Sequence, residues 1–117
     1  MNCCVGYNWA MNTPALKQNP GLKDFQIYVH DMVIKRGFDD ETVPEIFMLF
    51  LEECGEMAKA ARKLQNIKTD KNSAELNLQH EVADVFSYLL DICNQFDIDL
   101  ETAFREKEQI NDTRVWA

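Results

Sequence analysis

Apolar residues recur at helical spacing in four segments of the chain, and no segment of useful length alternates with the period of a β-strand. The four segments are residues 22–35, 42–65, 72–96 and 99–111, and the third starts near Asn72 or Ser73. Short, mostly polar stretches separate them. The pattern therefore predicts an all-α chain with four helices.

Residues at the predicted helix ends support these boundaries. Gly37 supplies a stop after the first segment, because glycine readily adopts the left-handed conformation that ends many helices. Thr42 is a suitable N-cap for the second segment, with Pro44 in the first turn and Glu45 placed to complete a capping box. Asp99 is a suitable N-cap for the fourth segment.

The apolar faces of the second and third segments are wider than four helices of one chain can cover. The fourth segment adds further positions that we expect to be buried: Leu100, Ala103, Phe104 and Ile110. We therefore expect a four-helix bundle that is completed by homo-oligomerisation, as a homodimer or a homotetramer.

The chain divides into an arm and one domain. Residues 1–20 contain two of the three prolines and show no sustained periodicity, which predicts a poorly ordered N-terminal arm. Residues 21–117 form the expected domain, since a chain of 117 residues is long enough for one modest core and too short for two.

Composition argues against several classes of protein. The hydrophobic fraction is 46%, and no apolar run approaches the roughly 20 residues that cross a bilayer, so we expect no membrane partner. The N-terminus lacks the features of a secretory signal, and the cysteines lack the spacing of a disulfide framework or a zinc site, which favours a cytoplasmic protein with reduced thiols. The formal net charge of −8 argues against binding to a nucleic-acid polymer.

Acidic residues are concentrated on the second and third predicted helices. Glu52, Glu53 and Glu56 lie on the second, and Glu81 and Asp84 lie three positions apart on the third. If these helices are antiparallel neighbours, Glu56 lies level with Glu81, and Glu53 lies level with Asp84. A single acidic pair also fits a solvated helix face, but four carboxylates around one small volume require a positive charge among them. A divalent cation meets that requirement.

The oxygen ligands favour Mg²⁺, with Mn²⁺ as the other candidate, over zinc, iron or copper. A di-iron bundle would carry Glu-x-x-His, whereas His80 directly precedes Glu81 and points about 100° away from it on a helix. Mg²⁺ usually shares its coordination shell with substrate phosphates, so the expected ligand is a polyphosphate.

These motifs resemble those of a known family, the MazG-like all-α nucleoside triphosphate pyrophosphohydrolases, which are relatives of dimeric dUTPases and dCTP pyrophosphatases. The resemblance covers about residues 22–116 and rests on Glu-Glu-x-x-Glu at 52–56 followed by Glu-x-x-Asp at 81–84. The neighbouring stretches "GEMAKAARK" and "EVADVFSYLLDICNQFDIDLETAF" are also similar to the family. The resemblance implies Mg²⁺-dependent hydrolysis of a (deoxy)nucleoside triphosphate to the monophosphate and pyrophosphate, as in sanitation of the nucleotide pool.

The resemblance also implies roles for individual residues. The implied magnesium ligands are Glu53, Glu56, Glu81 and Asp84. Glu52 would act with Glu53 in catalysis, as a further ligand or as the base that orients water. The chain end "KEQINDTRVW" resembles the family's Lys-x-x-x-Asn-x-x-Arg end and implies phosphate contacts by Lys107, Asn111 and Arg114. Further candidates are Lys63 for the phosphates and Tyr88 for stacking on the base.

Two alternatives fit the same features. A non-catalytic helical module would use the acidic residues for metal-dependent interaction or nucleotide sensing. A phosphoribosyl-ATP pyrophosphohydrolase of the histidine pathway would share the fold. Pyrophosphate release separates the enzymes from the module, and a panel of substrates separates the enzymes from each other.

Overall fold

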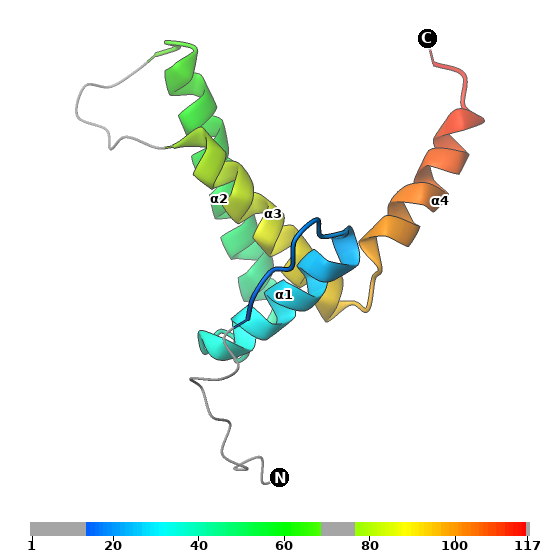
Figure 1. The fold of residues 1–117 in the computed structure, drawn as a ribbon. Helices are drawn as coiled ribbons and strands as arrows, with labels where there is room; N and C mark the ends of the chain where they lie inside the picture. The colour runs from blue at the N-terminus through cyan, green and yellow to red at the C-terminus, as the bar shows by residue number, and fades with distance from the viewer. Residues whose placement is uncertain (1–13, 69–76, 117) are drawn as a thin grey trace, which may run out of the picture.

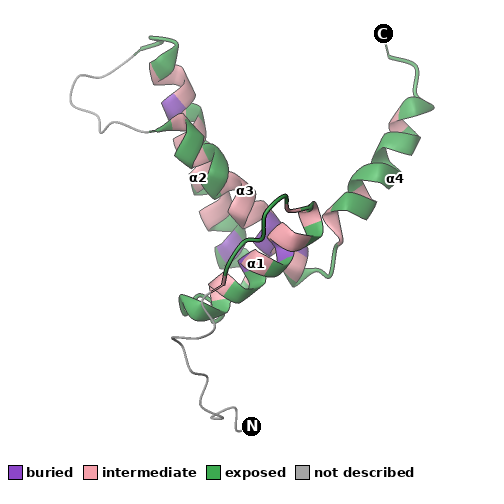
Figure 2. Ribbon diagram, viewed as in Figure 1, coloured by how far each residue is buried: buried purple, intermediate pink, exposed green. Residues whose placement is uncertain are grey.

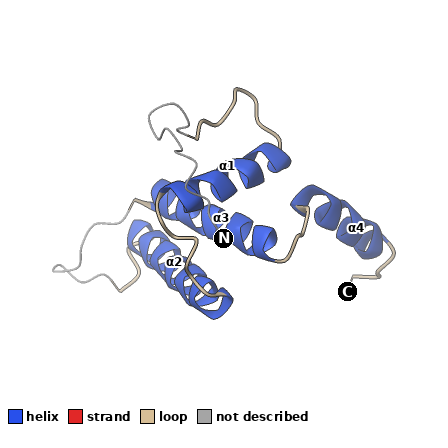
Figure 3. Ribbon diagram, turned by 90° about the horizontal axis from the view of Figure 1, so that it is seen from below, coloured by secondary structure: helices blue, strands red, loops and turns tan. Residues whose placement is uncertain are grey.

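The computed structural model describes residues 14–68 and 77–116, and within them it contains four helices (Figure 1). The helices are α1 (Leu22–Lys35), α2 (Val43–Leu64), α3 (Leu78–Gln95) and α4 (Leu100–Asp112). These two ranges contain no strand, as Figure 3 shows, so the all-α prediction is confirmed for them. Among the described residues, no helix combines the length and the apolar character needed to cross a membrane.

Hydrogen bonds at the helix ends explain most of these boundaries. At the start of α2, the Thr42 hydroxyl accepts from the backbone N–H of Glu45 at 3.4 Å, and the Glu45 carboxylate accepts from the N–H of Thr42 at 3.0 Å. This pair is the predicted capping box. After α1, Gly37 has a φ of 75°, and the N–H of Phe38 donates to the carbonyl of Val33 at 2.9 Å. The left-handed ending confirms the predicted stop at Gly37.

The start of α3 lies later than the sequence pattern predicts. The first residue of the helix is Leu78, and the side chain of Asn77 caps it by accepting from the backbone N–H of His80 at 3.2 Å. This cap replaces the predicted start near Asn72 or Ser73, positions that lie outside the described residues. Most of the predicted arm, residues 1–13, also lies outside them, and residues 14–20 contain no helix.

α2 and α3 lie side by side and run in opposite directions, and α1 packs across α3 (Figures 1 and 3). Most buried residues gather where these three helices meet, as Figure 2 shows. The buried apolar residues are Val29, Ile46, Ala60, Leu90 and Cys93. Phe25 of α1 packs edge-on against Phe86 of α3, with 5.3 Å between the ring centroids. The antiparallel pairing predicted for α2 and α3 is therefore present, and it brings their acidic residues onto facing sides.

A buried polar network attaches α1 to the turn between α3 and α4. Gln26 is only 4% exposed, and its Nε2 donates to Asn94 Oδ1 at 3.1 Å and to the carbonyl of Ile98 at 2.8 Å. Gln26 Oε1 accepts from the N–H of Leu100 at 3.0 Å, and Asn94 Nδ2 donates to the carbonyl of Gln26 at 2.9 Å. Because buried polar groups are costly to leave without partners, this network fixes where α1 crosses α3.

α4 contacts α1 and then projects away from the other helices (Figure 1). Phe104 and Ile110 are 63% and 51% exposed, so the prediction that both are buried is wrong within one chain. The reason is that no other described helix lies beside α4 along most of its length, and Figure 2 shows α4 as an almost entirely exposed helix. Burial of these side chains requires another surface.

Candidate active site

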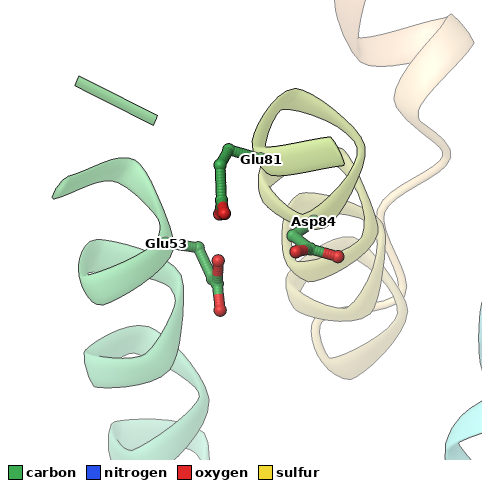
Figure 4. A group of neighbouring side chains, drawn as sticks. All are labelled: Glu53, Glu81 and Asp84. Carbon is green, nitrogen blue, oxygen red and sulfur yellow. The ribbon is translucent and has the colours of Figure 1, made fainter. Parts of the chain in front are cut away.

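Three of the predicted metal ligands converge between α2 and α3. Glu53 comes from α2, whereas Glu81 and Asp84 come from successive turns of α3 (Figure 4). One carboxylate oxygen from each residue lies within 4.8 Å of those from the other two. Glu81 and Asp84 are three positions apart, so both lie on the side of α3 that faces α2. We refer to Glu53, Glu81 and Asp84 as the carboxylate cluster.

The electrostatics of the carboxylate cluster disfavour three negative charges. Burial raises the pKa of the Glu53 carboxyl, and the charge of Asp84 and the hydrogen bond with Glu81 raise it further. Glu53 and Glu81 are half-buried, whereas Asp84 is exposed. Without a cation, Glu53 therefore holds its proton more tightly than an isolated glutamate does.

The ligand atoms of the carboxylate cluster fit a hard divalent cation. Oxygen atoms of carboxylates are the ligands that Mg²⁺ and Mn²⁺ prefer, and three of them lie close enough here to approach one ion together. Such an ion would also offset the charge repulsion that, after burial, contributes to the raised pKa of Glu53. The carboxylate cluster is thus a candidate metal site.

The other predicted residues of α2 lie beside the carboxylate cluster or beyond it. Glu56 is half-buried one turn further along the helix and, within the described residues, is not one of the three whose oxygens approach one another. Glu52 is exposed and directly precedes Glu53. Lys63 is half-buried near the C-terminal end of α2. The roles assigned to Glu52, Glu56 and Lys63 stay predictions.

The predicted phosphate contacts of the chain end lie apart from the carboxylate cluster. Lys107 and Asn111 are on α4 and Arg114 follows it, and α4 points away from α2 and α3 (Figure 1). Asn111 Nδ2 donates to Glu108 Oε1 at 3.1 Å, while Asn111 Oδ1 is buried with no hydrogen-bond partner among the described residues. One chain does not bring these residues to its own cluster, and their phosphate contacts stay predictions.

A pocket of about 190 Å³ lies beside the carboxylate cluster. Glu53 and Asp84 form part of its wall, and Tyr88 lies one turn beyond Asp84 on the same face of α3. Residues of α1 supply an apolar part of the wall: Val29, Met32 and Val33. An apolar wall with a few polar groups is typical of a small-molecule site. Tyr88, predicted to contact the base, therefore lines a pocket that adjoins the cluster.

The pocket also contains polar residues that the sequence analysis missed. Ser87 and Asp91 follow Asp84 on the same face of α3, and Glu41 comes from the connection between α1 and α2. Burial is the main cause of raised pKa values at Glu41, Tyr88 and Asp91. The spacing of Asp84, Ser87 and Asp91 was visible in the sequence. The spacing alone does not show that these residues line a pocket, because α1 supplies an apolar part of the pocket wall.

A comparison with protein families identifies the segment that carries this site. The model of the MazG nucleotide pyrophosphohydrolase domain matches residues 41–111, which include α2, α3 and most of α4. The matched segment contains the whole carboxylate cluster and the α3 residues of the pocket. No curated protein is similar enough in sequence to match the chain. Since the family match covers more than half of the chain, the protein belongs to the MazG nucleotide pyrophosphohydrolase family.

Proposed function

We propose that the protein hydrolyses a nucleoside or deoxynucleoside triphosphate to the monophosphate and pyrophosphate, with Mg²⁺ as cofactor. The observation that carries the proposal is the carboxylate cluster beside a pocket, inside the segment that matches a nucleotide pyrophosphohydrolase family. Mn²⁺ is the second candidate ion, because it prefers the same oxygen ligands. The role that we propose is sanitation of the nucleotide pool in the cytoplasm.

The acidic residues would hold the cofactor and prepare the attacking water. In this proposal Glu53, Glu81 and Asp84 bind Mg²⁺, and Glu56 approaches as a fourth ligand. Mg²⁺, when bound, offsets negative charge on the phosphate oxygens and lowers the pKa of water. Glu52 directly precedes Glu53 and is exposed. In this proposal its carboxylate orients the water or accepts its proton.

The pocket would take the nucleoside part of the substrate. Its apolar residues from α1 and the ring of Tyr88 offer surfaces for sugar and base, while the adjoining cluster faces the phosphates. The half-buried Lys63, further along α2, is a candidate for contact with the phosphate chain. The substrate would arrive as its Mg²⁺ complex, which reduces repulsion by a protein with a net charge of −8.

We further propose that a second copy of the chain completes the site. Phe104 of α4 and Leu51 of α2 are 63% and 64% exposed, and pairing in a homodimer or a homotetramer would cover such side chains. The pairing would also bring α4 of one copy towards the cluster of another. Lys107, Asn111 and Arg114 would then contact phosphate, and the two cations would stabilise charge on the departing pyrophosphate.

Product analysis tests the proposed reaction. The protein is incubated with standard and modified ribo- and deoxynucleoside triphosphates, in Mg²⁺ or with a chelator, and the products are separated by ion-exchange chromatography. We expect monophosphate and pyrophosphate in equal amounts, and only with Mg²⁺. Release of orthophosphate and a diphosphate would contradict the proposed reaction, and undiminished release with a chelator would contradict the cofactor.

The same panel separates the alternatives. Phosphoribosyl-ATP is included because its preferred hydrolysis would point to the histidine-pathway enzyme that shares the fold. A folded protein that releases pyrophosphate from none of these compounds would instead support a non-catalytic binding module.

A further inference from the structure

Asp91 is a buried carboxylate that the proposed catalytic machinery does not use. It lies on α3 and is only 5% exposed, yet it lines the pocket beside the carboxylate cluster. Burial raises the pKa of its carboxyl, while the hydrogen bond from Gln95 and the charge of His30 act in the opposite direction. A buried aspartate at a pocket wall is costly unless donors reach it, so its presence requires an explanation.

Among the described residues, Asp91 has few hydrogen-bond partners. Gln95 Nε2 donates to Asp91 Oδ1 at 3.4 Å, which is long for a hydrogen bond. Within residues 14–68 and 77–116, the ion pairs of the structure involve other carboxylates, those of Asp24, Asp99 and Glu101. A carboxylate has room for about four hydrogen bonds, so Asp91 retains accepting capacity towards the pocket.

The position of Asp91 along α3 matches the far end of a nucleotide. Asp84, Ser87, Tyr88 and Asp91 share one face of the helix, and all four line the pocket. At 1.5 Å per residue, Asp91 lies about 10 Å along the axis from Asp84 of the carboxylate cluster. A nucleotide with its phosphates at the cluster would therefore pass its sugar along Ser87 and Tyr88 and place its base near Asp91. Apolar residues of α1, such as Met32, would contact the face of the base.

We propose that Asp91 is the specificity-determining residue of this pocket and selects nucleobases that carry an exocyclic amino group. This inference rests on the proposed function, since it places a nucleotide in the pocket. An ionised carboxylate only accepts hydrogen bonds, so it pairs with the amino group of cytosine, adenine or guanine. Uracil and thymine present a carbonyl oxygen at the corresponding position, and two acceptors facing each other repel.

The test uses pairs of substrates in which one member lacks the amino group: uracil carries a carbonyl oxygen in its place, with a proton on the neighbouring ring nitrogen, and hypoxanthine carries a hydrogen. These pairs are dCTP with dUTP and dGTP with dITP, and kcat/KM is measured for each with Mg²⁺. We expect the amino-bearing member to be preferred by roughly 10- to 100-fold, the range of a hydrogen bond to a charged group. In Asp91→Asn, whose amide also donates, and in Asp91→Ala, the preference should fall to within about threefold.

A matched control and a binding assay make the outcome decisive. Asp97→Asn changes an aspartate near the end of the same helix that does not line this pocket, and it should leave the preference unchanged. Calorimetry with non-hydrolysable α,β-imido analogues of dCTP and dUTP gives the same comparison without turnover. Preferential binding of the dCTP analogue that is lost in Asp91→Asn would support the inference, even if the protein hydrolysed no triphosphate. Absence of hydrolysis would overturn only the proposed function.

Two results would overturn the inference. One is a wild-type protein that turns over or binds the paired compounds equally well or prefers the member without the amino group. The other is an amino preference that survives in both folded Asp91 variants. Circular dichroism establishes that each variant is folded. If neither variant folds, the wild-type comparison alone still overturns the inference when it shows no amino preference.

Discussion

Removing one charge from the carboxylate cluster should stabilise the metal-free protein. Glu53→Gln keeps the shape of the side chain and removes its repulsion by Glu81 and Asp84. Two unit charges 4.8 Å apart repel by about 0.9 kcal/mol at the dielectric constant of water and by about 3.5 kcal/mol at an effective value of 20. Because Asp84 is exposed, the lower figure is closer for each of the two pairs. The expected gain in the free energy of unfolding is therefore about 1–2 kcal/mol.

Thermal unfolding followed by circular dichroism measures this gain. For a domain of this size, about 1 kcal/mol shifts Tm by roughly 4–8 °C, so Glu53→Gln should melt roughly 4–16 °C above the wild type in chelator. Mg²⁺ should raise the Tm of the wild type more than that of the variant, because an ion that binds only the folded state stabilises it. Glu106→Gln, which removes an exposed charge from α4, is the control. It should melt at the wild-type temperature in chelator and should gain as much Tm from Mg²⁺ as the wild type does. A variant that melts below the wild type in chelator would refute the reasoning, because it would show that the Glu53 charge stabilises the fold.

Three further predictions concern pH, the core and assembly. Because the pKa of Glu53 is raised in the folded state, the metal-free wild type loses stability as the pH rises through that pKa. The difference in Tm between Glu53→Gln and the wild type should therefore vanish below a pH of about 4.5, the ordinary pKa of glutamate, and grow towards neutral pH. A constant difference across that range would contradict the role of this carboxyl. Gln26→Leu leaves the N–H of Leu100 and the carbonyl of Ile98 without the Gln26 side chain as partner. Urea denaturation should show that the free energy of unfolding falls by about 2–4 kcal/mol, whereas an unchanged midpoint would count against the network. If α4 lies in the proposed interface between copies, Phe104→Glu should sediment as a monomer and release less pyrophosphate than the wild type, whereas an oligomer that persists in the variant would exclude α4 from the interface.

Most helix boundaries were predictable because local chemistry determines them. The capping box at Thr42 and Glu45 and the left-handed Gly37 depend only on residues close in sequence. The start of α3 was not predictable in this way, because Asn72, Ser73 and Asn77 are all good N-caps and the periodicity does not choose between them.

The carboxylate cluster was predictable to the extent that it depends on helix periodicity and one antiparallel pairing. The prediction that Glu56 lies level with Glu81 assumed that α3 starts earlier than it does. In the structure it is Glu53, and not Glu56, that lies close to both Glu81 and Asp84. The pocket was not predictable, since it requires α1 to cross α3. Bonds such as that between Gln26 and Asn94, which are 68 positions apart, fix this crossing, and helical periodicity carries no information about them.

The burial of α4 failed as a prediction for a different reason. An apolar stripe on a helix predicts that something covers it, and it does not say whether the covering surface belongs to the same chain. Phe104 and Ile110 have the expected pattern and are exposed in the single chain. The same observation supports the proposal that a second copy completes the site.

The most direct test of the central claim compares pyrophosphate release by the wild type, Glu53→Gln, Asp84→Asn and Glu106→Gln, at saturating Mg²⁺ and with the best triphosphate of the panel. Circular dichroism first establishes that all four proteins have the same helix content. If the carboxylate cluster is the metal-dependent catalytic centre, both cluster variants lose at least about 100-fold in kcat while Glu106→Gln retains wild-type turnover. Wild-type turnover in either Glu53→Gln or Asp84→Asn would contradict the claim.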